Sequence, residues 1–198
     1  MDTFNVSLAG VGGQGILLTA NLLGRVAALA GLDVKKSEIH GMAQRGGSVA
    51  SSVRFGKKVF SPIIPNGESD LLVAFDRLEA LRCAPQLKKD GRAVVNDVYL
   101  TPVTVSSGQQ PELQDLSGSL KAALPDAVFV DAPGIAAKVG NERTANMVLA
   151  GAVSALTPFA EELWLKAMAE TFTGPKAKLL EINERAFALG REAVNAGS

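Results

Sequence analysis

The sequence predicts an α/β fold: an open, Rossmann-like, mostly parallel sheet flanked by helices and followed by a C-terminal helical tail. Three observations lead to this prediction. Short apolar runs typical of buried strands alternate with stretches of helical periodicity over most of the chain. A glycine cluster lies between the first apolar run and the first helical stretch. From residue 141 onward the apolar spacing is helical throughout.

The first strand, turn and helix are marked by changes of pattern. Residues 4–9 form a short apolar strand, and the glycine cluster at 10–15 follows it directly. An apolar helix is expected at 16–30, and Gly31 ends it.

The next segment predicts strands without a helix between them. A second strand is expected at 34–37 and a third at 48–55, and only a polar loop at 38–47 separates the two. No crossover helix fits in that loop. Residues 56–58 indicate a hairpin turn that leads to an extended pair at 59 and 60.

An alternation of strands and helices then returns. We expect a buried strand at 71–75, a helix at 77–87 and a strand at 93–96. A short edge strand is expected at 103–105, and a last strand at 128–130 closes the sheet.

Three helices are expected in the tail, at 144–156, 160–172 and 176–196. Thr157-Pro158 and Thr173-Gly174-Pro175 separate them, because proline cannot continue a helix but suits its first turn.

Composition limits the possible functions. The chain has 198 residues, 47% of them hydrophobic, which suits a single domain over 1–198 with the helical tail at about 141–198. Its 20 Lys and Arg balance 20 Asp and Glu, so no net charge attracts nucleic acid or an anionic membrane. The N-terminus lacks the basic start of a signal peptide, and no apolar run approaches the ~20 residues that span a bilayer. We expect a cytoplasmic protein.

Side chains that often carry out chemistry are scarce. Cys83 is the only cysteine, which excludes an intrachain disulfide and an iron–sulfur cluster ligated by this chain alone. His40 is the only histidine, and without a second histidine or a nucleophile a structural role is favoured over proton transfer. We interpret Cys83 as a small core side chain. The sequence therefore predicts no catalytic residue and no metal site.

The glycine cluster is a candidate binding site for an anion. Its pattern, G-x-G-x-x-G between a strand and a helix, allows a tight turn whose free N–H groups face outward. The predicted ligand-binding residues here are Gly10, Gly12, Gly13, Gln14 and Gly15. The same turn could instead serve only to pack the helix on the strand. A nicotinamide dinucleotide is disfavoured, because Glu38, at the place of a ribose-binding acid, precedes a polar loop and not a second strand–helix unit.

The loop at 38–48 is the second candidate site. It combines an acid, an imidazole, an amide, a guanidinium and several glycines between two strands. The predicted ligand-binding residues here are Arg45, Gly46, Gly47 and Ser48. Arg45 could bind a phosphate or a carboxylate through two parallel hydrogen bonds, or it could pair with Glu38 or Asp70 to stiffen the loop.

Together these two motifs carry a resemblance to a known family. Gly-Val-Gly-Gly-Gln-Gly at 10–15 with His-Gly-Met-Ala-Gln-Arg-Gly-Gly-Ser-Val at 40–49 closely resembles the gamma-type subunit of 2-oxoacid:ferredoxin oxidoreductases. The segment Met42-Ala43-Gln44 before Arg45 is most similar to the beta subunit of the indolepyruvate type. The resemblance continues at 61–65, 70–75 and 79–82 and returns at 146–152.

The resemblance implies an enzyme complex that oxidatively decarboxylates a 2-oxoacid with coenzyme A and passes electrons to ferredoxin. Thiamine diphosphate and iron–sulfur clusters would belong to a large partner subunit, so this chain would bind none of them and would not be active alone. It would complete the assembly and help to hold coenzyme A.

We also expect an extensive protein interface or a homodimer. The reason is that the helix at 16–30 is apolar nearly all round, and the tail repeats apolar side chains at Leu163, Trp164, Met168 and Leu179.

Two alternatives stay open. The chain could be the gamma subunit of a 2-oxoglutarate or pyruvate ferredoxin oxidoreductase. It could also be a free-standing nucleotide-binding module, as the glycine turn alone would suggest.

Overall fold

A six-stranded mixed sheet forms the centre of the molecule. The computed structural model describes residues 2–40 and 47–195, without the side chain of residue 40. The strands are β1 (Phe4–Val11), β2 (Asp33–His40), β3 (Ser48–Gly56), β4 (Ser69–Ala74), β5 (Leu87–Asn96) and β6 (Val128–Val130), in the spatial order β2-β3-β1-β4-β5-β6.

Pairing within the sheet divides it into two parts. β1, β4, β5 and β6 are parallel, whereas β3 is antiparallel to both β1 and β2. The close succession of β2 and β3 agrees with the expectation that no crossover helix fits between them. The prediction of an α/β sheet flanked by helices and followed by a helical tail is confirmed, with parallel pairing restricted to the half of the sheet that begins at β1.

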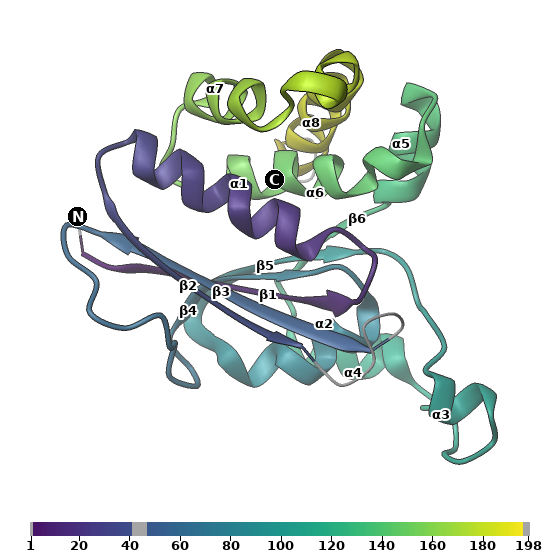
Figure 1. The fold of residues 1–198 in the computed structure, drawn as a ribbon. Helices are drawn as coiled ribbons and strands as arrows, with labels where there is room; N and C mark the ends of the chain where they lie inside the picture. Colours follow the sequence, from purple (N-terminus) through teal and green to yellow (C-terminus); the bar gives the residue numbers. More distant parts are fainter. Residues whose placement is uncertain (1, 41–46, 196–198) are drawn as a thin grey trace.

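Helices cover both faces (Figure 1). On one face lie α1 (Ile16–Leu29), α5 (Ala132–Val139), α6 (Ala145–Ala155), α7 (Glu161–Thr171) and α8 (Leu180–Asn195), and on the other lie α2 (Arg77–Cys83) and α4 (Leu116–Ala123). Short helices complete the list: η1 (Ala84–Gln86), α3 (Val103–Ser106), η2 (Glu142–Thr144) and η3 (Gly174–Leu179). In the described ranges, no helix is both long enough and apolar enough to cross a membrane.

The layering explains why α1 is apolar nearly all round. One side of α1 packs on the sheet and the other meets α6 and α7, so it belongs to the main core. Trp164 and Met168 of α7 are also fully buried within this chain, whereas Leu179 is 38% exposed. The apolar surfaces from which we expected an interface are therefore mostly covered by the chain itself.

The edge strand expected at 103–105 and the hairpin expected after residue 55 are both wrong. Residues 103–106 form α3, not an edge strand, because this segment projects away from the sheet and has no strand edge beside it (Figure 1). Residues 57–60, directly after β3, form no strand. Val59 is buried, and its N–H donates to the Asp33 carboxylate at 2.9 Å instead of to a neighbouring strand. Two helices, α4 and α5, were not expected.

Helices α6 and α8 touch through two glycines. A Cβ placed on Gly151 would lie well under 3.0 Å from the Phe187 carbonyl oxygen, and one on Gly190 would crowd the Val148 carbonyl oxygen as closely. Both obstacles are backbone atoms, which cannot rotate away. The crossing therefore requires glycine at both positions, because any side chain would push the helices apart.

We predict that Gly151→Ala lowers the free energy of unfolding by about 1–3 kcal/mol, the usual cost of overpacking a core. Gly24→Ala in α1 is the matched control, since its Cβ would meet side chains and no backbone: the flexible Lys36 chain at 3.2 Å and the Val34 Cγ1 at an ordinary 3.7 Å. Denaturant unfolding should show the control unchanged or more stable, because alanine favours a helix by roughly 0.5–1 kcal/mol over glycine. Equal stability of the two variants would contradict the glycine crossing.

Candidate functional site

The carboxyl ends of β1 and β4 define the candidate site. After β1 the chain enters α1 on one face of the sheet, and after β4 it enters α2 on the opposite face (Figure 1). Neighbouring parallel strands whose connections leave in opposite directions open a crevice at this edge, where ligands of α/β sheets usually bind. The glycine turn follows β1 at this edge, and the described end of the second motif lies beside it, because Ser48 at the start of β3 pairs with Val11.

Backbone geometry accounts for the glycines of the turn. Gly13 and Gly15 have φ of 106° and 87°, values that residues with a side chain rarely adopt. A Cβ on Gly10 would lie 2.7 Å from the Phe75 Cβ, and one on Gly15 would lie 2.7 Å from the Asn146 Nδ2. Asn146 begins the last segment of the family resemblance, so the tail packs directly on the turn.

Gln14 joins the turn to β4. Its Oε1 accepts a hydrogen bond from the Val11 N–H at 2.6 Å, and its Nε2 donates to the Phe75 carbonyl at 2.9 Å. The side-chain amide therefore bridges the ends of β1 and β4. A ligand contact by Gln14 stays a prediction, and it would use only the remaining hydrogen of the amide.

The start of α1 keeps the features expected of an anion site. Gly15 caps the helix without a side-chain hydrogen bond, and the first turn contains no acidic residue. A bound anion would therefore be favoured by the helix dipole and by N–H groups that lack side-chain partners. Three N–H groups of the turn already have acceptors: that of Val11 donates to the Gln14 side chain, that of Gln14 to the Val11 carbonyl at 3.2 Å, and that of Gly12 to the Gly47 carbonyl at 2.9 Å.

That hydrogen bond brings the two motifs together. Val11 pairs with Ser48, so Gly47 and Ser48 lie against the glycine turn. Arg45 and Gly46 are outside the described residues, and their predicted role stays a prediction. Asp70 is one of the two possible partners of Arg45. It lies at the start of β4, at the opposite end of the strands from the glycine turn, and accepts hydrogen bonds from the Asn5 N–H and from Lys88.

Acidic side chains that the sequence reasoning did not select lie beside Ser48. The Ser48 hydroxyl donates to Glu79 Oε2 at 2.6 Å, and Arg82 donates to Glu79 Oε1 at 2.5 Å. Asp76 caps α2 and accepts the N–H groups of Leu78, Glu79 and Leu100. An aspartate just before a helical stretch is an N-cap signal, but its spatial neighbours could not be inferred from it.

A cavity of about 270 Å³ opens between α2, Ser48 and the segment after β5. Its lining consists of Val11, Ser48, Asp76, Leu78, Glu79, Arg82, Leu100, Thr101, Pro102 and Val103. The two carboxylates outnumber the one guanidinium, so this half of the edge does not favour an anion. In contrast, the first turn of α1 contains no acidic residue, so the α1 side of this edge suits an anionic group better.

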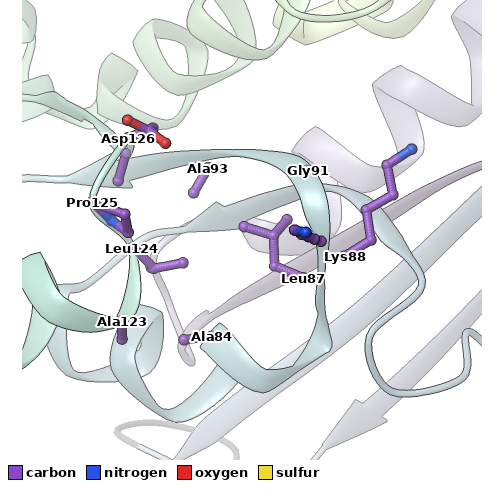
Figure 2. Close-up of a pocket in the computed structure, with 11 residues that line it drawn as sticks. Ala84, Leu87, Lys88, Gly91, Ala93, Ala123, Leu124, Pro125 and Asp126 are labelled. Atoms are coloured by element: carbon purple, nitrogen blue, oxygen red, sulfur yellow. The ribbon is translucent and has the colours of Figure 1, made fainter.

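A second hollow, of about 200 Å³, lies away from the crevice, between the beginning of β5 and the end of α4 (Figure 2). Its apolar lining includes Ala84, Ala93 and Leu124, and Figure 2 shows Lys88 extending away from them. Lys88 is committed to Asp70, whose hydrogen bond raises its pKa. We assign no ligand to this hollow.

Cys83 is confirmed as a core side chain on the inner side of α2. Burial, with a smaller contribution from the charge of Glu79, raises the pKa of its thiol to about 11. The thiol is therefore protonated near neutral pH and is a poor nucleophile. Within the described ranges, no group of three or more His, Cys, Asp and Glu side chains could hold a metal ion.

The motifs and the fold both have counterparts in known proteins. The sequence model of the pyruvate ferredoxin/flavodoxin oxidoreductase family matches residues 5–193. The chain belongs to this family. Its relatives include the indolepyruvate oxidoreductase subunit IorB of Thermococcus kodakarensis, 39% identical over 98% of this chain and 96% of the relative. The subunit of the same name from Archaeoglobus fulgidus is 38% identical over 94% of this chain and 92% of the relative.

The family fold is also seen in solved structures. The gamma subunit of a keto/oxoacid ferredoxin oxidoreductase from Geobacter sulfurreducens superposes with a TM-score of 0.70, covering 98% of this chain and 99% of the other at 24% identity. This likeness concerns the fold, and it extends over both the sheet and the helical tail of this chain.

We predict that Gln14→Ala destabilises the domain by about 1–3 kcal/mol, because the Val11 N–H loses its acceptor in a partly buried place. Asn21→Ala, on the exposed side of the same helix, should change stability by no more than about 0.5 kcal/mol. Thermal and urea unfolding of both variants would measure the difference. A Gln14 variant as stable as the control would show that the bridge between β1 and β4 is dispensable.

Proposed function

We propose that this chain is the small subunit of a 2-oxoacid ferredoxin oxidoreductase of the indolepyruvate type. In this reaction an arylpyruvate loses CO₂, its acyl group passes to the sulfur of coenzyme A, and the electrons reduce ferredoxin. The observation that carries the proposal is the similarity, over nearly the full length of both chains, to two proteins named as indolepyruvate oxidoreductase subunits.

The redox cofactors belong to a large partner subunit in this proposal. A single buried cysteine cannot supply the thiolates of an iron–sulfur cluster. We therefore derive no chemical step through either cofactor from this chain, and we assign it to binding and assembly.

Coenzyme A is the ligand that the site suits best. Its phosphates are anionic, and the start of α1 offers a helix dipole without acidic neighbours. The proposed contacts are those predicted from the two motifs: Gly10, Gly12, Gly13, Gln14, Gly15, Arg45, Gly46, Gly47 and Ser48. Among them, the glycines shape the turn and Arg45 supplies the positive charge.

Two alternatives are separated by simple measurements. A gamma subunit of a pyruvate or 2-oxoglutarate enzyme would favour those oxoacids in assays of the complex. A free-standing nucleotide-binding module would bind NAD, FAD or coenzyme A as an isolated chain, and calorimetry would detect it.

The first test is reconstitution with the large subunit from the same genome. We predict that the isolated chain is colourless and does not oxidise 2-oxoacids, and that the complex oxidises indolepyruvate with coenzyme A and ferredoxin. Turnover by the isolated chain, or a complex that uses only pyruvate or 2-oxoglutarate, would contradict the proposal.

The second test concerns Arg45. Arg45→Ala in the complex should raise the KM for coenzyme A by roughly tenfold or more, because a charge-assisted hydrogen bond contributes about 1.5–3 kcal/mol. Arg45→Lys should restore only part of the affinity, since an ammonium group lacks the two parallel donors. Normal kinetics in both variants would make Arg45 a structural loop residue, and failed assembly of the alanine variant would place it at the subunit interface.

A further inference from the structure

Glu79 is a buried carboxylate whose role the two sequence motifs do not explain. The residue is only 3% exposed, and each of its oxygens has one partner: Oε2 accepts from the Ser48 hydroxyl at 2.6 Å and Oε1 from Arg82 at 2.5 Å. Burial of a charge is unfavourable unless its oxygens are paired in this way. The arrangement therefore depends on both partners.

The ion pair with Arg82 alone does not account for the burial of Glu79. The two residues are three positions apart on the same short helix, and the Arg82 side chain is half exposed. Such pairs contribute little to stability and form equally well on an open surface. The hydrogen bond from Ser48 is different, because it joins Glu79 in α2 to the first residue of β3, which lies 31 positions earlier in the sequence.

Ser48 lies at the point where the second motif meets the first. It pairs with Val11 at the end of β1, and the preceding Gly47 carbonyl accepts the Gly12 N–H of the glycine turn. The position of Ser48 relative to α2 therefore sets how the end of the loop lies against the turn. Glu79 is the only side chain of the described residues that holds the Ser48 hydroxyl.

We propose that Glu79 is a positioning residue, which holds Ser48 and thereby places the end of the loop against the glycine turn for coenzyme A binding. This inference rests on the proposed function. It also changes the role predicted for Ser48. A serine hydroxyl has a single hydrogen to donate, and in Ser48 that hydrogen is used in the hydrogen bond to Glu79. A phosphate placed beside that carboxylate would be repelled, so Ser48 acts as an anchor and not as a phosphate ligand.

The two roles of Ser48 predict opposite effects of neutralising Glu79. Under the positioning role, Glu79→Gln and Ser48→Ala should each raise the KM for coenzyme A by about three- to tenfold in the complex, with kcat at saturation retained. The double variant should have a KM no higher than that of the more impaired single variant, because both changes act on the same hydrogen bond: a glutamine oxygen accepts it more weakly than a carboxylate, and alanine has no hydroxyl to donate. If Ser48 bound a phosphate directly, Glu79→Gln would remove a repelling charge and lower the KM. That result, or additive effects, would overturn the proposal.

Controls separate positioning from a general loss of structure. Ser48→Thr keeps the hydroxyl and should restore affinity, and threonine suits a strand. Arg77→Gln breaks a different ion pair of the same helix, that with Asp97, and should leave the KM unchanged. Ser48 is exposed, so Ser48→Ala should not disturb folding. If Glu79→Gln does not fold, Ser48→Ala alone tests the proposal.

Hydrogen exchange gives a readout that does not require activity. Backbone amides of residues 47–49 in the full chain should exchange faster in Glu79→Gln and Ser48→Ala than in the wild type or in Arg77→Gln. Unchanged exchange would overturn the positioning role even in a fully active complex. A wild-type complex that does not use coenzyme A would instead refute the proposed function, while the exchange measurement would still decide the role of Glu79.

Discussion

The bridge made by the Gln14 side chain is the constraint on which the rest of the site depends. This amide accepts the N–H of Val11, the last residue of β1, and donates to the carbonyl of Phe75, which follows β4 and lies 61 residues from Gln14, so it ties the ends of the two strands together. Because α1 and α2 leave the sheet from these two ends, the bridge also fixes the helix origins relative to each other. The tight glycine backbone brings Gln14 close enough to do this.

Charge is distributed unevenly along this edge of the sheet. Above the sheet, the start of α1 has no acidic residue in its first turn and suits an anionic group. Below it, Asp76 and Glu79 are buried next to a cavity with an apolar wall, and they are satisfied by backbone N–H groups, Ser48 and Arg82. The same edge therefore has a half that favours an anion and a half built around internal acids. An anionic group is therefore favoured on the α1 side of this edge and disfavoured on the α2 side.

The helical tail does more than extend the domain. Helices α6 and α7 cover α1, and α8 packs on α6 through the glycine crossing, which lets the two helices approach closely. Asn146 at the start of α6 contacts Gly15, so the tail also supports the turn that begins the site. Most of the apolar side chains of α1, together with Trp164 and Met168 of α7, are buried in this packing. The large apolar side chains that stay exposed in the described residues include Phe60, Ile63 and Val103.

Sequence alone determined the alternation of strands and helices, the glycine turn, the helix-free connection of β2 to β3, and the family, because these depend on local periodicity and on contiguous motifs. It missed α4 and α5, whose glycines and short apolar spacing resemble loops, and it mistook α3 for a strand because Val103 and Val105 are β-branched. Only the tertiary structure decided the partners of Gln14, the hydrogen bond from Ser48 to Glu79 and the burial of α1. Each of these joins residues far apart in the chain, and such pairs are brought together by packing, which no local pattern encodes.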